Sequence, residues 1–249
     1  MSTEFSGLTA VVTGAGSGIG LAVSKALHES GATVFGLDIQ AGAMAPYATW
    51  IECDVGITAS VTTAFEKIKS MTNVIDVLAN NAGVGAVGTV ADATDDDWSR
   101  VMNINVAGIG RVTTAALPLL RASTAAAIVN TCSIAATAGL PKRAVYSASK
   151  GAVLSLTLAM AADLVGEKIR VNCVNPGTAD TPWVERLLSL ADDPAAEKAA
   201  LEARQPLGRL VSAPEVARAI MYLANPAQGS TTGTVLAVDG GMHGLRLPK

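Results

Sequence analysis

The sequence predicts an α/β fold in which one doubly wound parallel sheet of about seven strands carries helices on both faces. Short segments rich in β-branched residues alternate along the chain with alanine-rich segments of helical period. This alternation is typical of parallel sheets with crossover helices. The first strand also runs directly into a glycine-rich turn and then a helix. Since no linker, repeat or low-complexity segment interrupts the pattern, we expect residues 1–249 to form a single domain.

The first half of the chain has the pattern of a βαβαβ unit. Residues 8–13, 33–38 and 74–79 are short, mainly aliphatic runs, which predict strands. Residues 20–30 and 61–71 carry apolar side chains at helical spacing, so we expect crossover helices there.

The second half continues this alternation. Valine and isoleucine predominate in three further runs, and alanine-rich segments of helical period lie between them. We therefore expect strands at 127–131, 169–174 and 234–238, and helices at 98–120, 146–164 and 213–224.

One long connection, 178–212, departs from the regular alternation. It contains Trp183, the acidic turn Asp192-Asp193-Pro194 and two short helical patterns. Connections of this length often cover a binding site. We expect the segment to act as a lid.

Composition and charge exclude several classes of protein. Half of the residues are hydrophobic and only 16% are charged, which is a globular composition. The net charge of −3 includes no long run of either sign, so we expect a small-molecule substrate and neither nucleic acid nor membrane as a partner. The N-terminus lacks a basic segment followed by an apolar one, and the weakly polar stretch 152–162 is too short to span a bilayer. These features predict a cytoplasmic protein.

The three cysteines predict neither disulfides nor a metal site. Cys53, Cys132 and Cys173 are odd in number, widely spaced and set among apolar residues, so we expect reduced, buried thiols. Cys132 as a nucleophile is the alternative, but neither His28 nor His243 belongs to a recognisable pairing motif.

The glycine-rich turn predicts a dinucleotide site. Glycines at 14, 16, 18 and 20 follow the first strand and open a helix, so the backbone can approach a pyrophosphate at the helix N-terminus. Asp38 ends the second strand about 20 residues later, where a carboxylate can accept hydrogen bonds from the adenosine ribose and repel a 2′-phosphate. No arginine or lysine stands in the turn or directly after Asp38, which favours NAD over NADP. Ordinary turn chemistry is the alternative role for Asp38.

Tyr146 and Lys150 are four residues apart, so a helix places their side chains on one face. A free phenol titrates near pH ~10, and a neighbouring positive charge is needed before it can exchange protons readily at neutral pH. Lys150 is placed to supply that charge. A solvated helix surface explains most such pairs, and the surrounding motifs must decide between the two interpretations.

Further motifs accompany the glycine turn along the chain: Thr-Gly-x-x-x-Gly-x-Gly at 13–20, Asn-Asn-Ala-Gly at 80–83, Asn105, Ser133, Tyr146 with Lys150, and Pro-Gly at 176–177 followed by Thr181. In this order, the motifs resemble the classical group of the short-chain dehydrogenase/reductase family, and the resemblance covers essentially the whole chain. It implies a Rossmann-type fold and a NAD-dependent oxidoreductase that interconverts a secondary alcohol and a ketone.

The resemblance implies four catalytic residues. Tyr146 is expected to exchange the proton of the substrate oxygen, and Lys150 to stabilise its phenolate and to hold the nicotinamide ribose. Ser133 is expected to donate to the substrate oxygen, with an ordinary strand-end serine as the alternative. Asn105 is expected to hold a water that links the lysine to solvent, with an asparagine bonded to a nearby carbonyl as the alternative.

Further cofactor contacts are implied in the same way. Asp54 and Val55, after a third strand, resemble the pair beside the adenine. Thr181, before Pro182, resembles a residue near the nicotinamide, with helix N-capping as the alternative. The full set expected to bind NAD is Gly14, Ser17, Gly18, Ile19, Asp38, Ile39, Asp54, Val55, Asn81, Ala82, Gly83, Tyr146, Lys150, Pro176, Gly177, Thr178 and Thr181.

Substrate residues are expected at Ser133, Arg143 and Trp183. Trp183 could close over the substrate, with packing of the lid against the body of the protein as the alternative. Arg143 could meet a carboxylate or a polyhydroxylated group, or remain a solvated surface side chain. The stretch Pro-Gly-Thr-Ala-Asp-Thr-Pro-Trp at 176–183 resembles members that act on sugars, sugar acids or hydroxy acids. Steroids, aryl ketones and 3-oxoacyl ketones stay open as alternatives.

Two other classes of function remain as alternatives. A non-catalytic dinucleotide sensor or scaffold would need neither Tyr146 nor Lys150, and a methyltransferase would use only the glycine turn and the acidic residue. The family resemblance also implies a homotetramer or a homodimer.

Overall fold

A computed structural model describes residues 3–189 and 191–246. Its centre is a seven-stranded, fully parallel sheet of order β3-β2-β1-β4-β5-β6-β9. The predicted doubly wound α/β class is confirmed. The strands are β1 (Thr9–Thr13), β2 (Thr33–Asp38), β3 (Thr49–Glu52), β4 (Val77–Asn80), β5 (Ala127–Thr131), β6 (Arg170–Pro176) and β9 (Val235–Val238).

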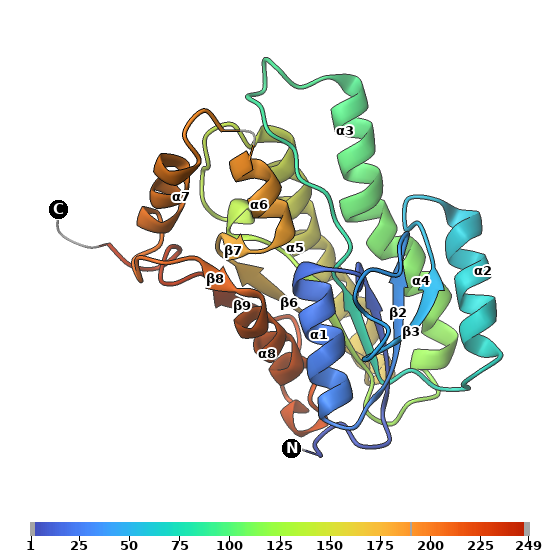
Figure 1. Ribbon diagram of the computed structural model, residues 1–249. Helices are drawn as coiled ribbons and strands as arrows, with labels where there is room; N and C mark the ends of the chain where they lie inside the picture. The colour runs from blue at the N-terminus through green and yellow to red at the C-terminus, as the bar shows by residue number, and fades with distance from the viewer. Residues whose placement is uncertain (1–2, 190, 247–249) are drawn as a thin grey trace.

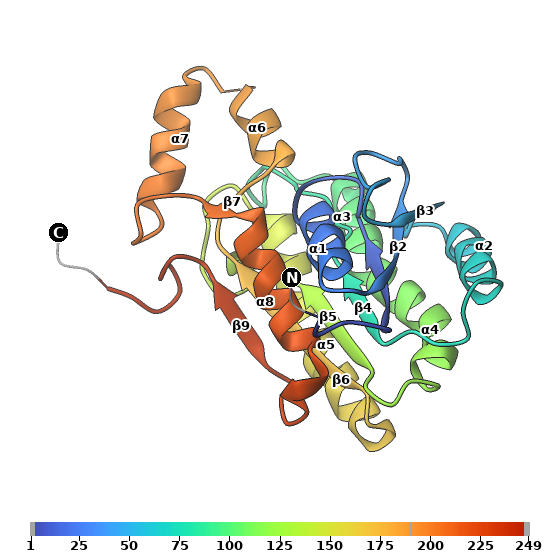
Figure 2. The ribbon, with the colours of Figure 1, turned by 60° about the horizontal axis from the view of Figure 1, so that its bottom comes forward.

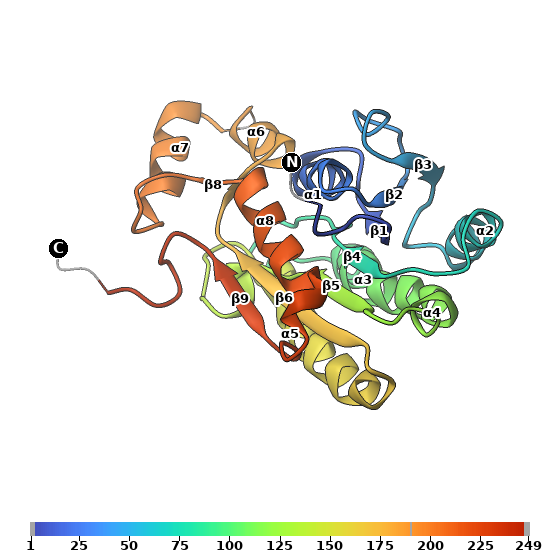
Figure 3. The same ribbon diagram turned by 90° about the horizontal axis from the view of Figure 1, so that it is seen from below.

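Helices cover both faces of this sheet (Figures 1 and 3). Two of them, α1 and α8, pack together on one face, and α2, α4 and α5 lie on the other. Their bounds are α1 (Gly18–Glu29), α2 (Thr58–Lys69), α3 (Asp95–Met102), α4 (Gly108–Leu120), α5 (Ala144–Leu164) and α8 (Ala213–Ala224).

The central strands are buried on both faces, which explains their unbroken apolar sequence. In β1, the side chain of Val11 joins the cluster beneath α2, α4 and α5. Its neighbours Ala10 and Val12 join the cluster beneath α1 and α8. Alternate side chains of a strand point to opposite faces, so each central strand contributes to two cores.

The chain order reverses between β1 and β4, which lie side by side although two strands separate them in sequence. The loops after β1 and β4 therefore diverge at the carboxyl edge of the sheet. Ligands of open α/β sheets bind in the crevice at such a point.

The prediction of one continuous helix over 98–120 is wrong. The structure has α3, a π-helical segment (Asn103–Ala107) and then α4. The segment 103–107 contains neither proline nor glycine, the residues that mark helix ends in a sequence, which is why the sequence pattern did not show the break.

The connection 178–212 contains α6 (Pro182–Ser189) and α7 (Pro194–Ala203). A two-stranded parallel sheet of β7 (Ala179–Asp180) and β8 (Val211–Ser212) closes its base. Figure 2 shows α6 and α7 projecting together beyond the carboxyl edge of the main sheet. Val184, Leu201 and Leu210 form a small apolar cluster of their own there.

Helix α5 is longer and more apolar than the stretch 152–162 suggested. With the 3₁₀ turn that follows it, it spans Ala144–Glu167 at a mean hydropathy of 1.4, which by length and composition alone would suffice to cross a membrane. Helices of globular cores pass the same test, and α5 packs on β6 with Ser149 and Lys150 among its buried residues.

Candidate active site

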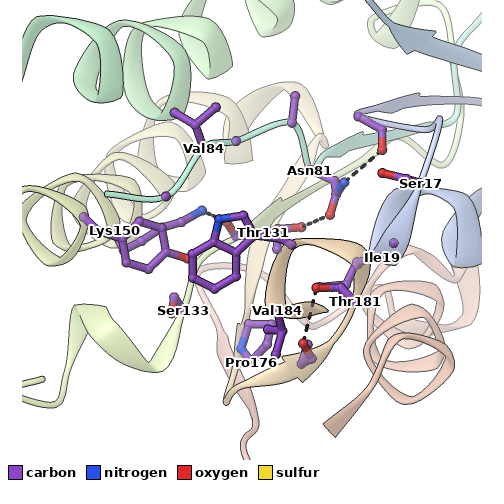
Figure 4. A pocket seen from close by; sticks show the side chains of 18 of the residues that line it. Ser17, Ile19, Asn81, Val84, Thr131, Ser133, Lys150, Pro176, Thr181 and Val184 are labelled. Atoms are coloured by element: carbon purple, nitrogen blue, oxygen red, sulfur yellow. Dashed lines mark hydrogen bonds between the residues drawn. The ribbon is translucent and has the colours of Figure 1, made fainter. Parts of the chain in front are cut away.

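A cavity of about 440 Å³ runs along the carboxyl edge of the sheet, a volume typical of small-molecule sites. The loops after the strands, the start of α1, the start of α5 and the lid line it (Figure 4). Of the residues expected in the site, only Asn105 does not line this cavity.

The glycine turn brings β1 into contact with the loop after β4. Gly14 has φ +65°, and a Cβ there would lie 2.9 Å from Cα of Ala82. A Cβ at Gly20 would collide with the carbonyl oxygen of Gly14. Both positions therefore require glycine, and they hold the start of α1 close to the cavity.

The N-terminus of α1 offers unpaired N–H groups to the cavity. Ser17, the N-cap residue, makes no side-chain capping bond, and the first turn carries no acid. Ser17, Gly18 and Ile19 all line the cavity. A helix N-terminus without an acidic residue of its own suits a phosphate.

Asp38, the last residue of β2, lies directly beside the glycine turn. Its Oδ2 accepts a hydrogen bond from the amide of Gly16 at 2.9 Å, and Oδ1 accepts one from the amide of Gln40 at 3.3 Å. Each carboxylate oxygen retains a further lone pair, so Asp38 is able to accept from a hydroxyl group in the cavity.

Asn81 and Thr13 join the diverging strands β1 and β4. Oγ1 of Thr13 accepts from the amides of Asn81 and Ala82, both at 2.9 Å, and Nδ2 of Asn81 donates to the carbonyl of Thr13 at 3.2 Å. On its other side, Oδ1 of Asn81 accepts from the hydroxyl of Thr131 at 3.4 Å (Figure 4). The backbone of 81–83 is thereby fixed along the cavity floor.

Tyr146 and Lys150 lie one turn apart near the start of α5. Nζ of Lys150 donates to the carbonyl oxygen of Thr131 at 2.8 Å and lies 5.7 Å from the ring centre of Tyr146. Lys150 is 6% exposed, and within the described chain no carboxylate lies within 4.0 Å of it. Its positive charge is therefore available to groups in the cavity.

Ser133 follows β5 and faces the cavity near Lys150 (Figure 4). Its Oγ accepts from the amide of Ala135 at 3.2 Å. Because this bond uses a lone pair, the hydroxyl hydrogen is free to donate into the cavity.

Asn105 lies in the π-helical segment and is 1% exposed. Its Oδ1 accepts from the amide of Val84 at 2.8 Å, and its Nδ2 donates to the carbonyl of Val84 at 2.9 Å and to Oγ of Ser149 at 3.0 Å. These are the bonds of the alternative interpretation, an asparagine bonded to a nearby carbonyl. Both hydrogens of the Asn105 side-chain amide are in use. The predicted contact between Asn105 and a water stays a prediction, and it would have to use another atom of this residue.

The segment 176–183 reaches the cavity from the side of the lid. The hydroxyl of Thr181 donates to the carbonyl of Ala179 at 3.3 Å, and the carbonyl of Thr181 accepts from Glu185 at the start of α6. Pro176, Gly177 and Thr178 line the cavity as well.

Trp183 lies directly over the loop that follows β4. A Cβ on Gly85 would lie 2.5 Å from Cζ2 of Trp183, and the indole is 37% exposed. Through this contact the lid rests on the body of the protein beside the cavity.

Sequence reasoning missed Arg186 and Arg204, which line the cavity together with Leu187 and Leu201. Both arginines belong to the lid, on α6 and at the end of α7. Arg186 stands three residues after Trp183, a helical spacing that could have pointed to it. Nothing local marks Arg204.

The three cysteines are free and buried. Hydrogen bonding with Cys173 and the charge of Lys150 lower the pKa of Cys132 to about 7, against the effect of burial, and the same contact raises the pKa of Cys173. Cys132 is only 2% exposed, and no histidine is among the described residues that line the cavity. This environment gives little support to Cys132 as a nucleophile.

The parallel sheet and its glycine-turn crevice define a Rossmann-type α/β protein of the dehydrogenase class. A family model described as enoyl-(acyl carrier protein) reductase matches residues 14–243. The dehydrogenase/reductase SDR family member 6 of Rattus norvegicus is 38% identical over 94% of this chain and 97% of its own length. The chain therefore belongs to the short-chain dehydrogenase/reductase family and is an oxidoreductase acting on alcohol or ketone groups.

Two further similarities extend over nearly the whole chain. The cis-4-hydroxycyclohexanecarboxylate dehydrogenase of Sinomonas cyclohexanicum is 38% identical over 97% of this chain and 98% of its own length. The ligand-free structure of the Thermoplasma acidophilum aldohexose dehydrogenase superposes with a TM-score of 0.93 at 30% identity, covering both chains completely.

Proposed function

We propose that this protein is a NAD(H)-dependent dehydrogenase that interconverts a secondary alcohol and a ketone, with Tyr146 as the acid–base residue. The observation that carries the proposal is the buried ammonium of Lys150, held 5.7 Å from the Tyr146 ring without a carboxylate within 4.0 Å in the described chain. An uncompensated positive charge beside a phenol stabilises the phenolate.

Each residue has a distinct role in this mechanism. When the substrate is an alcohol, Oη of Tyr146 takes the hydroxyl proton, and when it is a ketone the same atom returns it. Ser133 donates its hydroxyl hydrogen to the substrate oxygen and holds it in place. Lys150 stabilises the charge on Tyr146, and the carbonyl of Thr131 fixes its position.

The cavity has the features that a dinucleotide needs. The start of α1 offers N–H groups without a capping acid, and Asp38 stands at the wall formed by the end of β2. Bound NAD would supply the hydride acceptor. Among the described lining residues the basic side chains lie elsewhere, on α5 and the lid, so nothing beside Asp38 would neutralise a 2′-phosphate. This charge distribution supports NAD over NADP.

The substrate belongs to the sugars, sugar acids or hydroxy acids. Relatives with these printed activities include a hydroxycyclohexanecarboxylate dehydrogenase and an aldohexose dehydrogenase. The cavity walls on the substrate side combine apolar residues, Leu140 and Leu187, with arginines, Arg143 among them.

Replacement of Tyr146 tests the mechanism. The purified protein is incubated with NAD and a panel of secondary alcohols, and NADH absorbance is recorded. Tyr146→Phe is expected to lower kcat by about 100-fold or more, while NADH still binds with its usual affinity in a fluorescence titration. The matched control is Tyr222→Phe, which removes a hydroxyl from an exposed tyrosine of α8. Full activity of Tyr146→Phe would contradict the assigned proton donor, and loss of NADH binding would indicate a structural role.

A further inference from the structure

The cavity is electrostatically divided along its length. Its two acidic lining residues are Asp38, the last residue of β2, and Asp54, which follows β3. At the other end three arginines line the wall, and they come from the start of α5, from α6 and from the end of α7. Figures 1 and 2 place α6 and α7 on the side of α1 away from β3. These residues, Arg143, Arg186 and Arg204, are called the arginine group below.

Within residues 3–189 and 191–246, the arginine group lacks internal partners. None of its members lies within 4.0 Å of a carboxylate. Arg143 donates one side-chain hydrogen bond, to the carbonyl of Lys142 at 2.9 Å, and the guanidinium groups of Arg186 and Arg204 donate none. By contrast, the structural Arg170 donates to four backbone carbonyls. The arginine group therefore retains most of its donors for a ligand.

The positive charges also oppose one another. Burial and the charge of Arg204 lower the pKa of Arg143, while Glu197 and Tyr146 act in the opposite direction. Glu197 on α7 is the nearest acidic influence on Arg143, and it does not line the cavity. Like charges gathered at a partly buried wall are destabilising unless an anion lies between them.

The position of Arg143 relates this wall to the reaction site. It is the N-cap residue of α5, three residues before Tyr146. One helical turn rises about 5.4 Å, so a group bound by Arg143 lies only a few bonds from a carbon whose oxygen meets Tyr146. Leu187 and Leu201 line the same part of the cavity and suit an apolar linker.

We infer that the substrate carries an oxyanion group, a carboxylate in its simplest form, that the arginine group binds while the carbinol or carbonyl carbon lies at Tyr146. Guanidinium groups bind carboxylates, sulfonates and phosphates through paired N–H donors. The inference rests on the proposed function and narrows it, because it selects hydroxy acids and keto acids over neutral sugars.

The first experiment measures binding and needs no turnover. Fluorescence of Trp183, which lines the cavity, is recorded on the NADH-loaded protein during titration with cyclohexanecarboxylate, cyclohexanesulfonate, cyclohexyl phosphate and the neutral cyclohexanecarboxamide. At least one anion is expected to bind about 10- to 100-fold more tightly than the amide, as charge-assisted hydrogen bonds would give. The tightest anion identifies the group. Equal affinity for the amide and all three anions would overturn the inference.

The second experiment uses variants. Arg143→Met and Arg204→Met are each expected to reduce the preference for the anion over the amide by about 10-fold or more. Lys198→Met is the matched control, because Lys198 lies on α7 beside Glu202 and does not line the cavity. The site would be refuted if each of the two variants still bound the anion in preference to the amide by the original factor. Two variants are used so that poor folding of one of them does not prevent the test.

The third experiment separates this inference from the proposed function. Initial rates with NAD are compared for hydroxy acids, their methyl esters and aldohexoses. Acids turned over with higher kcat/KM than their esters support the inference, and aldohexoses preferred over acids contradict it. If no alcohol reduces NAD at all, the proposed function fails, whereas the binding experiment still decides whether the arginine group holds an anion.

Discussion

At the scale of single residues, the central feature is the buried ammonium group of Lys150, which has no carboxylate within 4.0 Å among residues 3–189 and 191–246. Removing a charge from water is unfavourable unless other groups compensate. In this structure the carbonyl of Thr131 accepts from Lys150 at 2.8 Å. An anionic form of Tyr146 would add a second partner, so the desolvated lysine would favour the proton exchange that we propose for this phenol.

Asp38 is expected to determine cofactor choice. Asp38→Ser removes an acceptor for the adenosine ribose and the charge that would repel a 2′-phosphate. We expect kcat/KM with NAD to fall by about 10- to 100-fold and kcat/KM with NADP to rise. Initial rates and NAD(P)H fluorescence titrations measure both effects.

The control for this prediction is Glu52→Ser. Glu52 pairs with Asp38 across β2 and β3, is exposed and does not line the cavity. Its replacement therefore removes one negative charge from the same edge of the sheet without changing the lining of the cavity. If Asp38→Ser keeps the original ratio of kcat/KM with NAD to kcat/KM with NADP, the carboxylate does not select the cofactor.

At the scale of elements, the π-helical segment between α3 and α4 connects three parts of the site. It places Asn105 where its amide bonds to both backbone groups of Val84 and to Ser149 on α5. The loop after β4 and the helix that carries Tyr146 are thereby held together. π-Helical turns are frequent at functional sites, and here the turn positions a buried side chain.

The lid is expected to depend on the contact between Trp183 and Gly85. In Gly85→Ala the new Cβ would lie 2.5 Å from the indole, so Trp183 must move away from the loop after β4. We expect the KM for substrate to rise about 3- to 10-fold, with a smaller change in kcat, because the lid closes less well over the bound substrate. Tryptophan emission should shift to longer wavelength.

Gly110→Ala is the matched substitution, since a Cβ at that position of α4 meets nothing within 4 Å. Emission from Trp50 and Trp98 is subtracted with a Trp183→Phe spectrum. An unchanged KM together with an unchanged spectrum would show that Trp183 does not close the cavity.

At the scale of the whole molecule, two features are consistent with assembly. Leu158 of α5 is 45% exposed, and Val165 in the 3₁₀ turn just after α5 is 56% exposed. β9 is an edge strand of the main sheet, and its Val235 is 37% exposed. Open edges and apolar helix faces are commonly covered in oligomers.

We therefore propose that the protein is a homotetramer or homodimer. Light scattering at micromolar concentration is expected to give four or two times the chain mass of 25.1 kDa. Leu158→Glu should shift the protein to smaller species, because a charge on that face of α5 would be desolvated in an interface. Ile57→Glu, at an exposed position before α2, is the control. A monomeric mass for the unmodified protein would refute the proposal.

The sequence was sufficient for the fold class because each element carries its own signal. β-Branched runs, helical periods and glycine turns are local patterns, and local patterns survive without knowledge of the contacts between elements. The predicted strands 33–38 and 127–131 and the helix 213–224 coincide with β2, β5 and α8. The break in 98–120 was missed because residues 103–107 include no proline or glycine to mark it.

The sequence was enough to predict the class of protein and the candidate site residues that belong to a motif, among them Asp38, Tyr146 and Lys150, because such residues are recognised by their spacing along one strand end or one helix. The contribution of the lid became visible only in the folded chain. Arg186 and Arg204 lie in one wall with Arg143 because the lid and the start of α5 line the same cavity. Such proximity arises from packing between distant segments, and no local pattern encodes it.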